Sequence, residues 1–172
     1  MLDDVCAERH HLVGELHEGL RVGLLGVGIG RLYNAAKSVG LGGWAISKAV
    51  DHARTRRVFG QTLSEHQGVT FPLAESATEL HAARLMSRDL AERLDRREPA
   101  LAEMAMAKGY ATEAALRAID RAIQVHGALG FTNEMHLTEA WQDIRKVCVA
   151  DGTAELMRRQ VATMLMSGRL RL

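Results

Sequence analysis

The segment Asp151-Gly152-Thr153 carries the strongest candidate for proton chemistry in the sequence. It precedes an apolar pattern that predicts a last helix, so the Asp151 carboxylate would lie beside free backbone N–H groups and the positive end of the helix dipole. Both favour the ionised carboxylate, and an ionised carboxylate on a loop can act as a general base. The alternative is that Asp151 or Thr153 is an ordinary helix N-cap.

The segment from Gln124 to Phe131 ends another predicted helix and contains two glycines, Gly127 and Gly130, three residues apart. Glycines allow the backbone to approach a ligand closely, and exposed backbone N–H groups can hold an anion. The alternative is a helix C-cap followed by a turn.

Three arginines, Arg54, Arg56 and Arg57, lie near the predicted C-terminus of a long helix. A guanidinium presents a planar fork of donors that suits a phosphate or pyrophosphate. The alternative is that these arginines compensate the helix dipole and are solvated.

Four residues near the N-terminus have side chains that could ligate a metal: Glu8, His10, His11 and His17. Their spacing matches no ligand pair on one face of a helix. No metal site is therefore expected.

The composition indicates which kind of scaffold positions these groups. The chain has 172 residues, of which 47% are hydrophobic, and its 22 basic and 21 acidic residues leave a formal net charge of +1. This excludes a disordered chain and argues against nucleic acid as the main partner, because a surface that tracks phosphates needs excess Lys and Arg. With two prolines and abundant helix-forming residues, the sequence predicts an all-α protein of one domain.

The cysteines and the apolar runs bear on the compartment. Cys6 and Cys148 are far apart and belong to no metal or disulfide pattern, which favours a reduced, cytoplasmic protein. The acidic start resembles no signal peptide, and the longest apolar run, Val22 to Gly30, is too short to span a bilayer. We therefore expect no membrane association.

Residues 1–18 differ from the rest of the sequence. Val5 to Ala7 and Leu12 to Gly14 look like short extended pieces without a helical face. We expect a tail over 1–18, resembling the end of a preceding β-domain, and a helical-bundle domain over 19–172.

The periodicity of apolar residues predicts the helices of that bundle. A long helix runs from about Leu25 and ends near Gly60, which would cap it, and the pair Ser64 and Gln67 is a capping-box pattern for a second helix. The remaining helices are predicted at about 100–126, at 137–147 and after Thr153. Short connections make an antiparallel, up-down helical bundle the expected architecture.

The order of these motifs resembles the C-terminal helical domain of the acyl-CoA dehydrogenase family. The resemblance covers almost everything from Leu12 to Leu165. The matching segments, in family order, are Leu12-Val13-Gly14-Glu15, Arg56-Arg57-Val58-Phe59-Gly60, Gln67-Gly68-Val69, Met106-Ala107-Lys108, Gln124 to Phe131, and Asp151 to Arg158. Single motifs of this kind are weak, but several in family order and spacing are specific.

The resemblance implies roles for individual residues. The family uses FAD held partly across a subunit interface, with Arg56 facing the pyrophosphate and Phe59 packed near the cofactor. The positions implied to contact FAD are Arg56, Phe59, His66, Gln67, Gln124, His126, Gly127, Ala128, Thr153 and Glu155. Arg31 and Gly152 are implied to contact the acyl-CoA thioester. Asp151 falls at the position of the base that removes the α-proton while a hydride passes to the flavin.

Several positions depart from the family pattern. The usual base is glutamate, and Asp151 is one methylene shorter, a displacement of roughly 1 Å that can cost about a hundredfold in rate. Ala128 replaces a glycine, Gln142 replaces an arginine and Ala154 replaces a common serine.

The resemblance also implies partners. An acyl-CoA substrate, a homo-oligomer or a partner acyl-CoA dehydrogenase subunit, and an electron-transfer flavoprotein as acceptor are expected. Family members carry a helical and a β-domain ahead of this region, so the chain alone would build only part of an active site. The alternative is a non-catalytic oligomerisation or partner-subunit module that kept the fold.

Overall fold

The computed structural model describes residues 3–170, and within them the chain forms an all-α domain with five α-helices. The helices are α1 (Gly19–Thr55), α2 (Gln67–Asp95), α3 (Leu101–His126), α4 (Leu137–Val147) and α5 (Ala154–Met166). Between them lie a hairpin of β1 (Arg57–Val58) and β2 (Gln61–Thr62) and three short 3₁₀ turns, η1 (Arg9–His11), η2 (Leu63–Glu65) and η3 (Gly127–Phe131).

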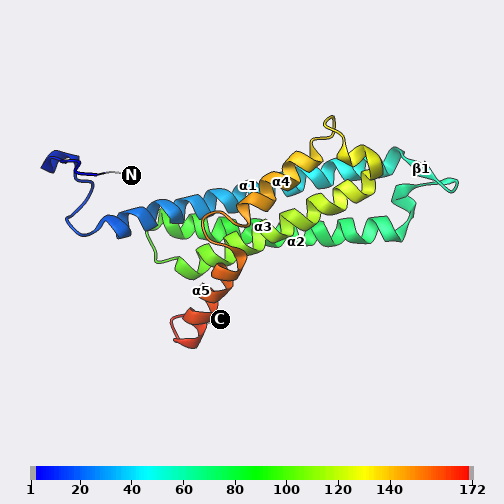
Figure 1. The fold of residues 1–172 in the computed structure, drawn as a ribbon. Helices are drawn as coiled ribbons and strands as arrows, with labels where there is room; N and C mark the ends of the chain where they lie inside the picture. The colour runs from blue at the N-terminus through cyan, green and yellow to red at the C-terminus, as the bar shows by residue number, and fades with distance from the viewer. Residues whose placement is uncertain (1–2, 171–172) are drawn as a thin grey trace.

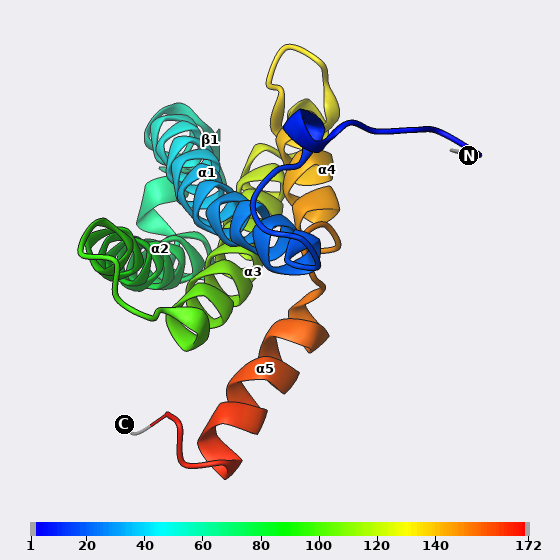
Figure 2. The ribbon, with the colours of Figure 1, turned by 90° about the vertical axis from the view of Figure 1, so that its left-hand side faces the viewer.

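The first four helices run up and down along one another, as the short connections predict (Figure 1). Helix α3 lies at the centre, between α1 and α2 on one side and α4 on the other, while α5 points away from the bundle (Figure 2). The predicted all-α, antiparallel helical architecture is confirmed.

Small residues set the spacing at the centre of the bundle. Seven alanines of α3 between Ala105 and Ala122 are almost completely buried: Ala105, Ala107, Ala111, Ala114, Ala115, Ala118 and Ala122. Gly42 of α1 lies directly against them, and a Cβ placed on it would lie 3.2 Å from the Cα of Ala115 and 2.7 Å from the side chain of Leu80. Helices α1, α2 and α3 therefore pack with their backbones close together.

The predicted start and end of the first helix are wrong. Helix α1 begins at Gly19, ahead of Leu25, and it ends at Thr55 rather than near Gly60. Gly60 lies instead in the turn of the β1–β2 hairpin, at φ +82°, with Arg57 paired to Thr62. A two-residue strand carries too little periodicity to be recognised in the sequence.

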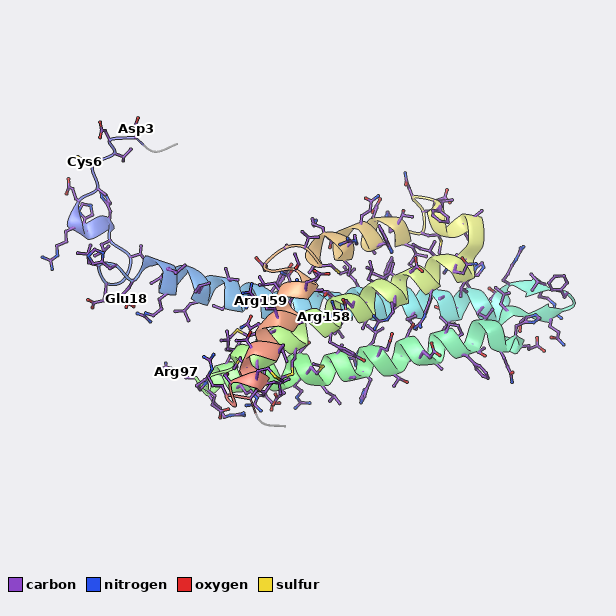
Figure 3. The ribbon with its side chains drawn as sticks, turned by 60° about the horizontal axis from the view of Figure 1, so that its bottom comes forward. Asp3, Cys6, Glu18, Arg97, Arg158 and Arg159 are labelled. Atoms are coloured by element: carbon purple, nitrogen blue, oxygen red, sulfur yellow. The ribbon has the colours of Figure 1, made fainter. Side chains whose placement is uncertain are left out.

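Two further local predictions are corrected. The capping box lies at Thr62 and Glu65, where the Thr62 backbone N–H donates to the Glu65 carboxylate at 2.6 Å, rather than at Ser64 and Gln67. The expected extended pieces of the tail are not strands among the described residues, since residues 3–18 contain only the turn η1 as regular structure. This tail, with Cys6 and Glu18, leads away from the bundle (Figure 3).

Candidate functional site

The loop between α4 and α5 has an unusual backbone at Asp151 and Gly152. Both residues have positive φ, +54° for Asp151 and +102° for Gly152. Each of their carbonyl groups accepts a hydrogen bond from a cationic side chain of another helix. Arg31 Nε of α1 donates to the Asp151 carbonyl at 3.0 Å, and Lys108 Nζ of α3 donates to the Gly152 carbonyl at 2.6 Å.

The Asp151 carboxylate lies against α1. Its Oδ2 accepts a hydrogen bond of 2.7 Å from Nδ2 of Asn34, which is buried. Gly30, one turn earlier, leaves room for it, because a Cβ on Gly30 would lie 3.1 Å from the same oxygen. One carboxylate oxygen is thus held while the residue as a whole stays exposed, an arrangement that suits a group which accepts a proton from a ligand.

The first turn of α5 confirms the N-cap alternative for Thr153, and the role of Asp151 as a base stays a prediction. Thr153 is the N-cap, since its Oγ1 accepts a hydrogen bond of 3.3 Å from the Leu156 backbone N–H. Asp151 precedes the cap and is turned toward Asn34 instead. Hydrogen bonds, first from its own backbone N–H and then from Thr153, lower the pKa of Glu155.

Asn34 and Lys108 are the two residues of this site that the sequence did not single out for a role. Asn34 lies three residues after Arg31 and therefore on the same face of α1. This spacing could have identified Asn34 from the sequence. Lys108 is a charged residue within an alanine-rich apolar stretch, and its side chain is fully buried. Burial lowers its pKa, an effect that the nearby Cys148 and Asp151 oppose.

A second group of predicted residues meets at the other end of the bundle. Arg56 follows the last residue of α1, and the segment from Gln124 to Ala128 joins the end of α3 to η3. Together with His52 and Leu129 they line one cavity of about 400 Å³. No hydrogen bond or ion pair within residues 3–170 engages the Arg56 guanidinium.

Two histidines stack in the wall of this cavity. The rings of His52 and His126 have centroids 4.5 Å apart and an interplanar angle of 27°. Nδ1 of His126 lies 2.8 Å from the Ala122 carbonyl, which can only accept, so Nδ1 carries the proton. Burial, followed by His126 and Arg56, lowers the pKa of His52.

Five of the ten residues expected to contact a cofactor do not line that cavity, and two of them, Thr153 and Glu155, lie at the start of α5. Phe59 is 98% exposed at the tip of the hairpin, at φ +49°. His66 precedes α2, and its Nε2 is buried without a hydrogen bond in the described part of the chain. Gln67 is the first residue of α2 and is exposed.

The two groups are far apart within one chain. Asn34 and Arg56 are 22 positions apart along or just beyond α1, which corresponds to about 33 Å of helix axis. One chain therefore presents a carboxylate site beside the middle of α1 and a guanidinium-lined cavity at the C-terminal end of α1.

The described residues offer neither a metal site nor a membrane span. No group of three or more His, Cys, Asp or Glu among residues 3–170 is arranged to hold a metal ion. Within that same range, every helix is too short or too polar to cross a bilayer.

Comparison with known proteins gives one consistent family. The family "Acyl-CoA dehydrogenase, C-terminal domain" matches residues 17–166. The short-chain specific acyl-CoA dehydrogenase of Sus scrofa mitochondria is 34% identical over 163 residues, which are 94% of this chain and 40% of that protein. The subunit CarC of the caffeyl-CoA reductase-Etf complex of Acetobacterium woodii is 29% identical over 166 residues, covering 96% of this chain and 44% of that protein.

The fold of the chain also matches solved structures. The glutaryl-coenzyme A dehydrogenase in complex with glutaryl-CoA superposes with a TM-score of 0.91 at 27% identity, over 96% of this chain and 42% of that one. In each of these comparisons, the chain spans less than half the length of the protein that it matches.

Proposed function

Because the chain belongs to the acyl-CoA dehydrogenase family, as a C-terminal domain, we propose that it contributes the catalytic base and part of the FAD site to the α,β-dehydrogenation of an acyl-CoA thioester. The observation that carries this proposal is the Asp151 carboxylate, which is held on α1 by Asn34 in a loop that Arg31 and Lys108 restrain. The rest of the active site would come from domains or chains outside this one.

The cavity between Arg56 and η3 fits a group that carries phosphates. It combines an unpaired guanidinium of the described chain with backbone at Gly127, where φ is +62° and a Cβ would meet no atom within 4 Å. Donor forks and open, glycine-lined backbone are what a pyrophosphate requires. Arg56, Gln124, His126, Gly127 and Ala128 would hold that part of FAD, and Phe59, His66 and Gln67 would meet it outside the cavity.

Asp151 would remove the α-proton of the substrate with its free oxygen, while Asn34 holds the other. When bound, FAD supplies the acceptor for the hydride that leaves the β-carbon, so one proton and one hydride leave the substrate. Arg31 and Gly152 would contact the thioester, and Thr153 and Glu155 would contact the cofactor beside the base. Removal of an α-proton requires that base and thioester are held in a fixed relation, and the three hydrogen bonds to the loop support this.

The separation of about 33 Å between the two sites argues for a site shared between subunits. The carboxylate site of one chain and the cavity of another would then serve one cofactor, in a homo-oligomer or with a partner subunit of the same family. A relative is named as part of a reductase–Etf complex, and we extend this to an electron-transfer flavoprotein as the electron acceptor here.

The first experiment is an FAD titration of the purified chain, followed by its absorbance spectrum and its mass in solution. Arg56→Gln should weaken FAD binding about tenfold or more, because a charge-assisted hydrogen bond is lost. Arg54→Gln, which removes a neighbouring exposed guanidinium outside the cavity, is the matched control and should leave the affinity unchanged. Equal affinities for the two variants would remove the pyrophosphate role of Arg56.

Asp151→Asn tests the base in any assembly of this chain that turns over acyl-CoA with an electron acceptor. The amide keeps the shape but cannot accept the α-proton, so turnover should fall at least a thousandfold, roughly the upper range for loss of a general base. FAD affinity should change little, because Arg56 and the cavity are untouched and the contacts to FAD beside the base are assigned to Thr153 and Glu155 rather than to Asp151. Retained turnover would exclude Asp151 as the base.

A second function is favoured by one surface. Large hydrophobic side chains of α1 are exposed ahead of Arg31: Leu20, Leu24, Leu25 and Ile29. Several large apolar side chains exposed on one segment of a helix favour an interaction site, so a non-catalytic oligomerisation or partner-subunit module is the alternative. A folded oligomer that binds no FAD under the titration above would favour this alternative.

A further inference from the structure

Lys108 is a buried cation for which the proposed reaction has no direct use. It lies on α3 among buried alanines and is 0% exposed. Its ammonium reaches the loop ahead of α5 and donates to the Gly152 carbonyl at 2.6 Å. The contact joins residues that are 44 positions apart in the sequence.

The loop that Lys108 reaches is the strained part of the site. Two successive residues, Asp151 and Gly152, adopt left-handed backbone, which an aspartate enters at a cost. Such a backbone persists only where its surroundings hold it. Here the two carbonyls are held by Arg31 of α1 and Lys108 of α3, each through a charge-assisted hydrogen bond.

We propose that Lys108 is a positioning residue for Asp151: its ammonium holds the Gly152 carbonyl and so keeps the 151–152 turn in the form that directs the carboxylate to Asn34. The meaning of this tether for catalysis rests on the proposed function. The tether itself is a property of this chain and can be measured without substrate or cofactor.

The charges around Lys108 indicate that its ammonium restrains the Gly152 carbonyl and that the side chain does more than fill space. A methionine would fill the same space without the cost of burying an ammonium. Groups from three other helices and one loop face the amine. Cys148 at the end of α4, Asp151 in the loop and Glu155 of α5 favour its charged form, and Arg31 of α1 opposes it. Burial has the larger effect and lowers the pKa of Lys108.

This lowered pKa predicts a pH response. The ammonium loses its proton at a lower pH than an ordinary surface lysine, and the charge-assisted hydrogen bond to Gly152 weakens as it does so. The 151–152 turn should therefore become less ordered as the pH rises, and this change should begin below the usual pKa of lysine near 10.5.

The first test uses NMR of the ¹³C,¹⁵N-labelled chain with the variant Lys108→Met. The carbonyl ¹³C resonance of Gly152 should shift upfield, because the carbonyl loses a charge-assisted hydrogen bond, and the amide resonances of residues 151–153 should shift with it. Two controls separate the tether from other effects. Thr112→Val replaces a fully buried hydroxyl one turn further along α3, and Lys48→Met removes a lysine charge from α1; both should leave these signals unchanged.

The second test does not depend on the folding of Lys108→Met. In the native chain, the Gly152 carbonyl resonance should titrate over the same alkaline range, and Cys148→Ala should keep that titration, which separates the amine from the thiol. An unchanged Gly152 signal in Lys108→Met, or an alkaline titration that Cys148→Ala abolishes, would overturn the proposal. Failure of FAD or acyl-CoA binding with these signals intact would refute the proposed function and leave the tether in place.

Discussion

Asp151 and Gly152 concentrate strain and restraint at one point of the chain. Three side chains from two helices fix two peptide carbonyls and one carboxylate oxygen within a single turn. The left-handed backbone of Asp151 costs of order 1–3 kcal/mol, and charge-assisted hydrogen bonds of roughly 1.5–3 kcal/mol each are enough to offset it. The carboxylate is therefore placed before any ligand arrives, which is the condition for an efficient base.

His52 gives a pH prediction at the scale of a single residue. Its pKa lies below the ordinary value of 6.5, so the unfolded state binds more protons in the window between the lowered pKa and 6.5. The free energy of unfolding should therefore fall as the pH falls through that window. In His52→Phe, which keeps a ring against His126, this part of the pH dependence should disappear from urea unfolding measured between pH 7 and pH 5.

His81→Phe is the control for that experiment, because His81 is exposed on α2 and far from Arg56 in sequence. It should keep the native pH dependence. If the free energy of unfolding of His52→Phe falls between pH 7 and pH 5 as steeply as that of the native chain, the burial of His52 does not cause this pH dependence.

Some residues of the site could be found from the sequence and others could not. Arg56 and the segment from Gln124 to Ala128 were predicted and do line one cavity, because both lie at helix ends on the same side of an up-down bundle. Asn34 and Lys108 depend on contacts across 117 and 44 positions of sequence, which no local pattern encodes. Their roles follow only from the packed structure.

The helices α1 and α3 approach closely because the residues between them are small. Gly42 faces Leu80 and Ala115, while its neighbour Gly43 faces open space. Two adjacent glycines in one helix thus have opposite effects on stability. One permits contact between helices, and the other only costs helix stability.

These two glycines make a matched pair for a packing prediction. Gly42→Ala should lower the free energy of unfolding by roughly 1–3 kcal/mol, because its Cβ meets the backbone of Ala115 and must displace it. Gly43→Ala should raise it by about 0.5–1 kcal/mol, because alanine is the better helix former. Urea unfolding of the two variants checks both signs, and a destabilised Gly43→Ala would contradict the assignment of faces.

The bounds of the elements show where periodicity is informative. The third and fourth helices were predicted within one residue, since strong apolar faces and clear breaks mark them. The end of α1 was missed because Arg56 to Gly60 contains no breaker that stops a helix before its glycine. Its start was missed because four glycines precede Arg31 from Gly23 to Gly30, and the helix forms in spite of their low propensity.

The molecule as a whole is an elongated bundle with two candidate sites, one beside the middle of α1 and one at the C-terminal end of α1 (Figure 1). The carboxylate site contains Asp151, Asn34 and Lys108, and the cavity is lined by Arg56 and His126. Because about 33 Å of helix separates them, changes at one end should not be felt at the other.

Energetic independence of the two ends can be measured with double variants. The effects of Lys108→Met and Arg56→Gln on the free energy of unfolding should add to within about 0.5 kcal/mol. The effects of Lys108→Met and Asp151→Asn, which share one loop, should deviate from additivity by roughly 0.5 kcal/mol or more. Coupling between the distant pair would mean that the bundle transmits strain along its length.

The distance between the two ends has a genetic consequence. If two chains share each site, a population that mixes chains damaged at Asp151 with chains damaged at Arg56 contains pairings in which both intact ends meet. Two such defective alleles would complement one another, whereas two alleles damaged at the same end would not. The length of α1 thus determines which combinations of inherited defects are silent and which are not.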